Sequence, residues 1–220
     1  CRISSPATPT TCTDLLKLLT SIRITFVWLI LSLSGAACAS TVAPTILVFG
    51  DSLSAAYGIP RESGWVNLLV KRLETRQPPF RVINASVSGE TSAGGLTRLP
   101  EVLATHHPKL TILALGANDG LRGLPSRETA RNLETMVRLL QKQGSEVLLV
   151  GTQLPPNYGP AYTRKFLALY SEVARARRVR LVPFLLEGMA GQRQRFQADG
   201  LHPDAEAQPV LLDNVWRELS

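Results

Sequence analysis

The sequence predicts a three-layer α/β/α protein built on a doubly wound, parallel sheet of five strands. Two observations lead to this prediction. Five short apolar runs recur along the chain, and they are continuous rather than alternating, which is typical of strands buried on both faces. Several of the segments between them carry apolar residues at helical spacing, and such alternation of strand and helix gives a parallel sheet covered by helices. The chain of 220 residues is long enough for one domain with a sizeable core.

Each predicted strand is a short run rich in Val, Ile and Leu. The runs occupy residues 45–49, 81–85, 110–115, 146–151 and 179–183. Their length suits strands better than helices, which usually need ten or more residues. We therefore expect these five runs to form the buried centre of the molecule.

Four segments carry the helical pattern. They are residues 61–76, 126–143, 160–177 and 204–219. In the second of them, Leu133, Val137 and Leu140 fall on one face. Ser126 is placed to cap the start of this helix and Gly144 to end it. We interpret every such apolar stripe as core packing.

The N-terminal segment has a different composition. Residues 24–33 form a continuous apolar run that follows Lys17 and Arg23, and small residues ending in Ala37-Cys38-Ala39 come after it. Basic, then apolar, then small is the order of a secretory signal peptide. The run is shorter than the ~20 residues that a membrane-spanning helix needs, which favours cleavage over retention as an anchor.

This pattern divides the chain into an N-terminal extension with a signal peptide, residues 1–39, and a single domain, residues 40–220. We expect export with cleavage near Ala39 and no stable membrane span after processing. All three cysteines lie in the first part, so the exported domain would have neither disulfide bonds nor a thiol nucleophile.

Composition excludes some classes of function. The net charge of +7 is spread along the chain, without the dense basic run and interleaved aromatic residues that nucleic-acid binding favours. The sequence has no Walker-type glycine loop and no cluster of His and Cys at ligand spacing, which disfavours a metal or phosphate enzyme.

A polar, glycine-containing loop follows four of the five predicted strands. The loops read GDSLS at 50–54, SVSGETSAGG at 86–95, GANDG at 116–120 and, farther from its strand, DGLHP at 199–203. Each loop alone is compatible with an ordinary turn. Because ligands of doubly wound sheets bind outside the carboxyl ends of the strands, the four loops together predict a functional site.

The residues of these loops fit acyl transfer by a serine nucleophile. A serine hydroxyl is a weak nucleophile until a neighbouring base takes its proton, and Ser52 and His202 both fall at the predicted edge. Asp199 precedes His202 by three residues, so a tight turn can bring its carboxylate to the imidazole. Pro203 suits the first turn of the final helix. His106 and His107 precede the third strand, at the opposite edge, and are expected to face solvent.

An acyl-transfer site also needs donors for the negative charge that develops on the carbonyl oxygen. The backbone N–H groups of Ser52 and Gly89 can supply two, and Gly89 lets the chain approach a substrate closely. The side-chain amide of Asn118 can supply a third, although an asparagine at the end of a strand can instead cap a loop. Asp51 is expected to hold the first turn through hydrogen bonds to backbone N–H groups.

These four blocks, in this order, resemble those of the SGNH (GDSL) hydrolase family. The stretches NASVSGETSAGG, GANDGLRGLP, LPPNYG and DGLHPDAEAQP are similar to the bacterial periplasmic thioesterase, arylesterase and lysophospholipase branch. The resemblance covers about residues 45–219 and departs from the family slightly at Ala117, where glycine is common.

The resemblance implies a flavodoxin-like sheet, no cofactor and hydrolysis of acyl esters, thioesters or lysophospholipids in the periplasm. It implies Ser52 as nucleophile, His202 as base and Asp199 as the residue that orients it. It also implies an oxyanion hole made by the N–H groups of Ser52 and Gly89 and by Asn118. We expect a monomer.

Apolar residues near these loops are candidates for an acyl-chain groove. They are Leu53, Leu121, Leu124, Pro156 and Tyr158. Packing beneath loops explains them equally well. Glycines at both ends of the 120–125 segment suggest a mobile lip over the acyl chain.

Two other functions stay open at this point. One is a carbohydrate acetylesterase of the same fold, which a preference for short acyl groups on sugars would identify. The other is a binding module that kept the fold without the activity, which is disfavoured because every catalytic residue type is present in order.

Overall fold

The computed structural model describes residues 43–76 and 79–219. The predicted N-terminal extension, residues 1–39, lies outside the described residues, and with it the predicted signal peptide. Residues 43–76 and 79–219 belong to one compact unit, to which the description below refers. No helix within 43–76 and 79–219 is both long and apolar enough to cross a membrane.

The predicted sheet is confirmed. Its five strands are β1 (Thr45–Gly50), β2 (Arg81–Asn84), β3 (Leu110–Ala114), β4 (Glu146–Val150) and β5 (Arg180–Val182). All neighbouring pairs are parallel, in the order β2-β1-β3-β4-β5. This is the flavodoxin-like order, in which the strand sequence reverses direction beside β1 and a ligand crevice opens at the carboxyl ends.

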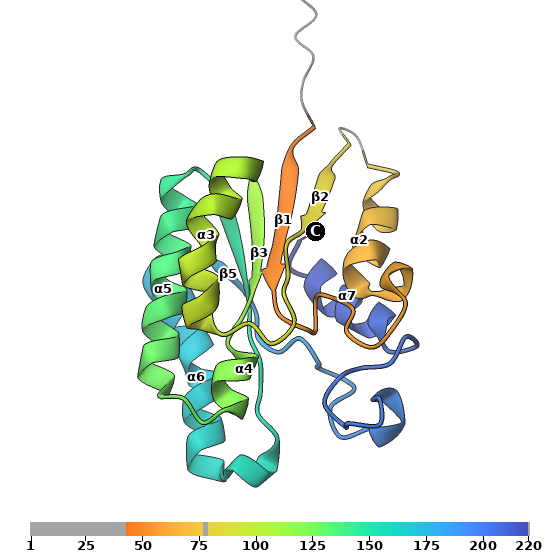
Figure 1. Cartoon of the computed structure of the whole chain (residues 1–220), viewed down its shortest axis with the longest axis vertical. Helices are drawn as coiled ribbons and strands as arrows, with labels where there is room; N and C mark the ends of the chain where they lie inside the picture. Colours follow the sequence, from red (N-terminus) through yellow and green to blue (C-terminus); the bar gives the residue numbers. More distant parts are fainter. Residues whose placement is uncertain (1–42, 77–78, 220) are drawn as a thin grey trace, which may run out of the picture. The chain divides into compact units, whose positions relative to one another are not determined.

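Helices cover both faces of the sheet, and three short 3-10 helices lie in its connections. The elements are η1 (Arg61–Ser63), α2 (Trp65–Leu73), α3 (Ser92–His106), α4 (Ala117–Leu121), α5 (Ser126–Lys142), η2 (Pro156–Tyr158), α6 (Pro160–Arg177), η3 (Arg193–Arg195) and α7 (Gln208–Trp216). Helices α3, α5 and α6 lie on one face, and α2 and α7 lie on the other (Figure 1).

The two faces have separate hydrophobic cores because successive strand residues point to opposite sides. Leu47 and Phe49 of β1 pack under α3, α5 and α6, whereas Ile46 and Val48 pack under α2 and α7. Both sides of β1 are therefore buried, which explains why its sequence is apolar without alternation.

Helix α3 is the largest element that the sequence pattern did not reveal. We placed residues 86–95 in a loop, but α3 begins within that segment, after Thr91, whose side chain accepts a hydrogen bond from the Gly94 N–H. Two glycines and Pro100 weaken the helical signal. Gly95 has a packing reason: a Cβ there would lie 2.4 Å from Cδ1 of Leu115, so only glycine lets α3 approach the sheet this closely.

The structure also corrects two predicted ends. Ser126 is the first residue of α5 rather than its N-cap. The N-cap is Pro125, which makes no side-chain hydrogen bond there. At the other end of α5, Gly144 has the positive φ that is expected just after a helix. Pro203 lies before α7 and forms an isolated antiparallel β-bridge with Phe196, so its predicted place in the first turn of the final helix is wrong. Pro209 occupies that turn.

Candidate active site

The predicted site residues meet at the carboxyl edge of the sheet. Ser52 follows β1, and Gly89 lies in the loop between β2 and α3. Asn118 is in the first turn of α4, directly after β3, and Asp199 and His202 lie between η3 and α7. Segments from four separate parts of the sequence thus contribute to one edge, below the strands in Figure 1.

The turn after β1 is compact. A Cβ on Gly50 would lie 2.8 Å from Ser54 Oγ and 3.0 Å from the carbonyl oxygen of Ala114, so the chain passes β3 too closely for a larger residue. Asp51 Oδ1 accepts a hydrogen bond from the N–H of Leu53 at 3.1 Å, as expected from the sequence. These contacts place Ser52 at the tip of the turn, half-buried.

Ser52, His202 and Asp199 form a continuous chain of hydrogen bonds. Ser52 Oγ lies 2.9 Å from His202 Nε2, and His202 Nδ1 lies 2.6 Å from Asp199 Oδ2. The side chain of His202 is 21% exposed and that of Asp199 is 38% exposed, so the imidazole is largely enclosed while the carboxylate reaches solvent.

Asp199 is held as a carboxylate by the turn that it closes. Its Oδ1 accepts hydrogen bonds from the N–H groups of Leu201, at 2.9 Å, and His202, at 3.0 Å. The backbone hydrogen bond from His202 is the main reason that the pKa of Asp199 is lowered to about 2, and the His202 side chain and Leu201 N–H add to it. An ionised Asp199 accepts a hydrogen bond from Nδ1–H of His202, which keeps the proton on Nδ1 and leaves Nε2 free to accept the Ser52 hydroxyl proton.

Gln197 and Arg193 fix the loop that carries His202, and the sequence reasoning missed both. Gln197 Nε2 donates to the carbonyl of Tyr57 at 2.8 Å and to that of Pro203 at 3.1 Å, which ties the two sides of the site together. Arg193 donates to three consecutive carbonyls of residues 196–198. The Gln197–Tyr57 contact joins loops that are far apart in the sequence, which no local pattern indicates, whereas the Arg193 contacts lie within one loop.

Tyr57 is a further residue that the sequence reasoning missed. Its ring centroid lies 4.5 Å from that of His202, tilted by 41°, and the residue is 51% exposed. It therefore covers one side of the imidazole at the entrance to the site. Its position five residues after Ser52, in the same loop, is the one signal in the sequence that could have pointed to it.

The three candidate oxyanion donors are available in the structure. Asn118 Nδ2 donates one hydrogen to the carbonyl of Glu90 at 3.0 Å, which fixes the orientation of the amide and leaves its second hydrogen free. The backbone N–H groups of Ser52 and Gly89 have no hydrogen-bond partner within the described residues. Gly89 has a φ of 80°, and Arg122 Nη2 donates to its carbonyl at 3.0 Å.

Asp119 explains why Asn118 is held in place. Its buried carboxylate accepts hydrogen bonds from Ser92 N–H at 2.8 Å, from Ser92 Oγ at 2.5 Å and from Thr129 Oγ1 at 3.3 Å. The short helix α4 is thereby anchored to the start of α3 and to α5. Asp119 is a structural neighbour of the site, and the turn-like Asn-Asp-Gly sequence is the beginning of a helix.

Asp51 is a buried acid beside the candidate nucleophile. It is 2% exposed, and burial is the main reason that its pKa is raised from 3.8 to about 7. Its hydrogen bond from Leu53 and the charge of His202 oppose this rise, and Asp119 adds to it. Below about pH 7 the carboxyl is therefore protonated in the folded protein, whereas in the unfolded chain it titrates near 3.8.

This raised pKa predicts a pH-dependent stability. The contribution of the Asp51 carboxyl to the free energy of unfolding is largest below pH 3.8, the pKa in the unfolded chain. It is lost as the pH rises from 3.8 to about 7, the pKa in the folded protein. We expect Asp51→Asn, which keeps the oxygen that binds Leu53, to remove this loss and to raise the free energy of unfolding near pH 8 by up to about 4 kcal/mol. Urea unfolding of both proteins across this pH range measures it.

Asp213→Asn is the control, because the Asp213 side chain is 56% exposed in a surface ion pair with Arg72. It should change the free energy of unfolding by less than about 1 kcal/mol at any pH. Parallel stability curves for wild type and Asp51→Asn would contradict a buried, protonated Asp51.

The five residues proposed to line an acyl-chain groove lie in different surroundings in the structure. Leu53 packs against the core under α2 and α7, whereas Leu121 and Tyr158 pack against the other core and are joined by a 2.9 Å hydrogen bond from the tyrosine hydroxyl to the leucine carbonyl. Leu124 and Pro156 are exposed. Packing thus accounts for three of the five, and the exposed pair is left at the surface beside α4 and η2.

The 120–125 segment is tied to α6 and η2. Tyr162 donates from its hydroxyl to the carbonyl of Leu124 at 3.0 Å, in addition to the Tyr158 contact with Leu121. Gly123 has a φ of 67°. The mobility of this segment stays a prediction.

The other two histidines lie far from this edge, at the end of α3. His107 is exposed, as expected, and His106 is half-buried. Across residues 43–76 and 79–219, no group of three or more His, Cys, Asp or Glu side chains is arranged to hold a metal ion.

Comparison with known proteins identifies the family. The model of the GDSL-like lipase/acylhydrolase family matches residues 48–208. The chain is 51% identical to esterase TesA of Pseudomonas aeruginosa over 80% of this chain and 88% of that protein. It is 38% identical to thioesterase 1/protease 1/lysophospholipase L1 of Escherichia coli K12, over 82% of this chain and 85% of that protein.

A solved structure agrees. The crystal structure of TesA superposes with a TM-score of 0.78 at 51% identity, covering 80% of this chain and 98% of the TesA chain. The family model spans most of the chain, and TesA is 51% identical to it in sequence and similar to it in fold. The chain therefore belongs to the GDSL-like lipase/acylhydrolase family.

Proposed function

We propose that this protein is a serine hydrolase that cleaves carboxylic esters and thioesters through a covalent acyl-enzyme. The hydrogen-bonded chain from Ser52 Oγ through His202 to the Asp199 carboxylate is the observation that carries the proposal. It joins a hydroxyl, a base and an anion in the order that nucleophilic catalysis requires.

In the first step, Ser52 Oγ attacks the acyl carbonyl carbon while His202 Nε2 takes the hydroxyl proton. The imidazolium that forms is stabilised by the ionised Asp199, 2.6 Å from Nδ1. The tetrahedral intermediate then collapses: the bond to the alcohol or thiol breaks, and His202 gives its proton to the leaving group. The acyl group remains on Ser52.

In the second step, water attacks the acyl-enzyme. His202 takes a proton from the water and returns it to Ser52 Oγ as the acid leaves. In both steps, the negative charge on the carbonyl oxygen is accommodated by the N–H groups of Ser52 and Gly89 and by the free amide hydrogen of Asn118. Donors that are fixed before the reaction need no reorganisation, which is the source of their catalytic effect.

The proposed substrates are small-molecule acyl esters, including aryl esters, together with acyl-CoA thioesters and lysophospholipids. The similarity to a protein named thioesterase 1/protease 1/lysophospholipase L1 supports this range. The exposure of Asp199 and Tyr57 also supports it, because this side of the site opens to solvent, into which a large leaving group can extend.

A panel of substrates tests this proposal. We expect the purified protein to hydrolyse p-nitrophenyl esters from acetyl to palmitoyl, palmitoyl-CoA and a lysophospholipid. Activity confined to acetylated sugars would identify a carbohydrate acetylesterase instead. No turnover of any acyl substrate would contradict the proposal and favour a binding module.

Asn118→Ala tests the oxyanion hole. Loss of one donor is expected to lower kcat by roughly 10²–10³-fold with little change in KM, because the donor acts on charge that is present only in the transition state. Steady-state kinetics with p-nitrophenyl butyrate measures kcat and KM separately. Gln141→Ala is the control, since the Gln141 amide lies near the end of α5 and donates to the carbonyl of Arg177 at the surface, and it should retain nearly full kcat. A change confined to KM would argue against this role.

We further propose export to the periplasm as a monomer, with cleavage near Ala39. The order of basic, apolar and small residues before residue 40 supports export. Mass spectrometry of the N-terminus of the protein recovered from a periplasmic extract tests it.

A further inference from the structure

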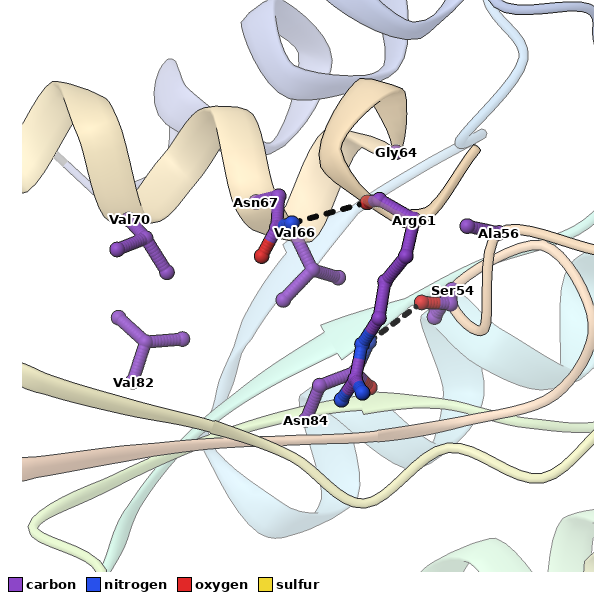
Figure 2. A pocket seen from close by; sticks show the side chains of 9 residues that line it. All are labelled: Ser54, Ala56, Arg61, Gly64, Val66, Asn67, Val70, Val82 and Asn84. Carbon is purple, nitrogen blue, oxygen red and sulfur yellow. Dashed lines mark hydrogen bonds between the residues drawn. The ribbon is translucent and has the colours of Figure 1, made fainter. Parts of the chain in front are cut away.

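A cavity lies beside the loop that carries Ser52. It has a volume of about 90 Å³ and is lined by residues of η1, α2, β2 and the turn after β1 (Figure 2). The volume exceeds the ~10–15 Å³ that a single water needs and is below the ~150 Å³ of a cavity that holds benzene. A ligand of a few heavy atoms fits these limits.

The two ends of this cavity differ in chemistry. Val70 of α2 and Val82 of β2 face each other at one end, and Val66 lies between this end and the other (Figure 2). Arg61 and Asn84 lie at the other end, where the Arg61 side chain extends from η1 toward Asn84 (Figure 2). A molecule with one polar and one apolar end matches this arrangement.

The polar end carries unused hydrogen-bond donors. Asn84 Nδ2 donates to the carbonyl of Ser54 at 2.7 Å, and Asn67 Nδ2 donates to that of Arg61 at 3.0 Å. Each amide keeps one further N–H. The guanidinium of Arg61 makes no hydrogen bond or ion pair with any residue in the described ranges, so all five of its donors are free.

The charge at this end is positive. Helix α2 begins at this wall, since Gly64, the residue before its first, lines the cavity together with Arg61. The positive end of the helix dipole adds to the guanidinium charge. A planar guanidinium with neighbouring amides matches the two oxygens of a carboxylate.

We propose that this cavity binds a short-chain carboxylate, with its carboxylate on Arg61 and Asn84 and its alkyl chain between Val70 and Val82. The acid that ester hydrolysis releases is a molecule of this kind, and that identification rests on the proposed function. Ser54 and Ala56, which line the cavity, follow Ser52 in the same loop, so the bound acid contacts the segment that presents the nucleophile.

A titration with sodium butyrate, followed by amide NMR shifts, tests the proposal without any turnover. Saturable shifts are expected at Ala56, Gly64 and Val82. Arg61→Gln should weaken this binding by about tenfold or more, because a charged hydrogen bond is lost. Arg127→Gln, which removes an exposed charge on α5 at the other face of the sheet, should leave it unchanged. Butanol, which has the same chain without the charge, should bind about tenfold more weakly.

A second variant tests the apolar end. Val70→Phe fills the space opposite Val82 and should abolish the shifts at Val82. Shifts confined to Ser52, Gly89 and Asn118 would mean that the acid occupies only the reacting site, and they would overturn the proposal, as would no saturable shift. Failure of ester turnover with intact butyrate binding would instead contradict the proposed function alone.

Discussion

Ser52→Ala is expected to lower kcat for p-nitrophenyl butyrate by roughly 10⁴–10⁶-fold. Without Oγ, no acyl-enzyme forms and the proton-accepting Nε2 of His202, 2.9 Å away in the wild type, has nothing to activate. The residual rate should reflect only binding and the oxyanion donors acting on water. Because Ser52 is half-buried at the tip of a turn, the substitution should leave the melting temperature nearly unchanged.

Ser54→Ala is the matched control. Ser54 lies two residues further along the same turn and is 2% exposed, and its Oγ has no hydrogen-bond partner among the residues that the structure describes. Its removal is expected to leave kcat close to the wild-type value. Equal losses in the two variants would show that the turn, rather than the Ser52 hydroxyl, determines the rate.

His202→Gln is expected to reduce kcat by a similar factor, roughly 10⁴–10⁶-fold. Glutamine retains polarity and approximate length but cannot take a proton from Ser52 at neutral pH, and it leaves Asp199 without an imidazolium to stabilise. Steady-state kinetics measures the loss, and near-native melting shows that the protein is folded.

The double variant makes this test sharper. Ser52→Ala with His202→Gln should be hardly slower than either single variant, since residues that act as one unit contribute non-additively. If the two losses multiplied, the residues would act independently, and the proposed proton transfer between them would be wrong.

The sheet was predictable because parallel strands have a strong sequence signature. β1, β3 and β4 are buried on both faces, so their runs of Val, Ile and Leu stand out. Helix α5 was predictable because one face is apolar and the other is charged. The strand order followed from the fold that the motif blocks imply.

Helix α3 was hidden for a physical reason. Its glycines and Pro100 are poor helix formers, but Gly95 is required where α3 meets Leu115, the residue after β3, and tertiary packing outweighs local propensity. The same holds at Asn118, where a turn-like sequence starts α4 because the buried Asp119 binds α3 and α5.

The contact of Ser52, His202 and Asp199 was predictable because each residue follows a strand or lies in a recognisable motif. The contacts that support them were not. Gln197 reaches the carbonyl of Tyr57, 140 residues away, and nothing in either local sequence indicates this contact. Such contacts depend on how loops from distant segments pack, which only the folded structure shows.

Covalent labelling with a p-nitrophenyl phosphonate ester, read by intact-protein and peptide mass spectrometry, is the most direct test of the central claim. We predict one phosphonyl adduct per chain, located on Ser52, absent from Ser52→Ala and present in Ser54→Ala. An adduct on another residue, or equal labelling of Ser52→Ala, would contradict Ser52 as the nucleophile of this hydrolase.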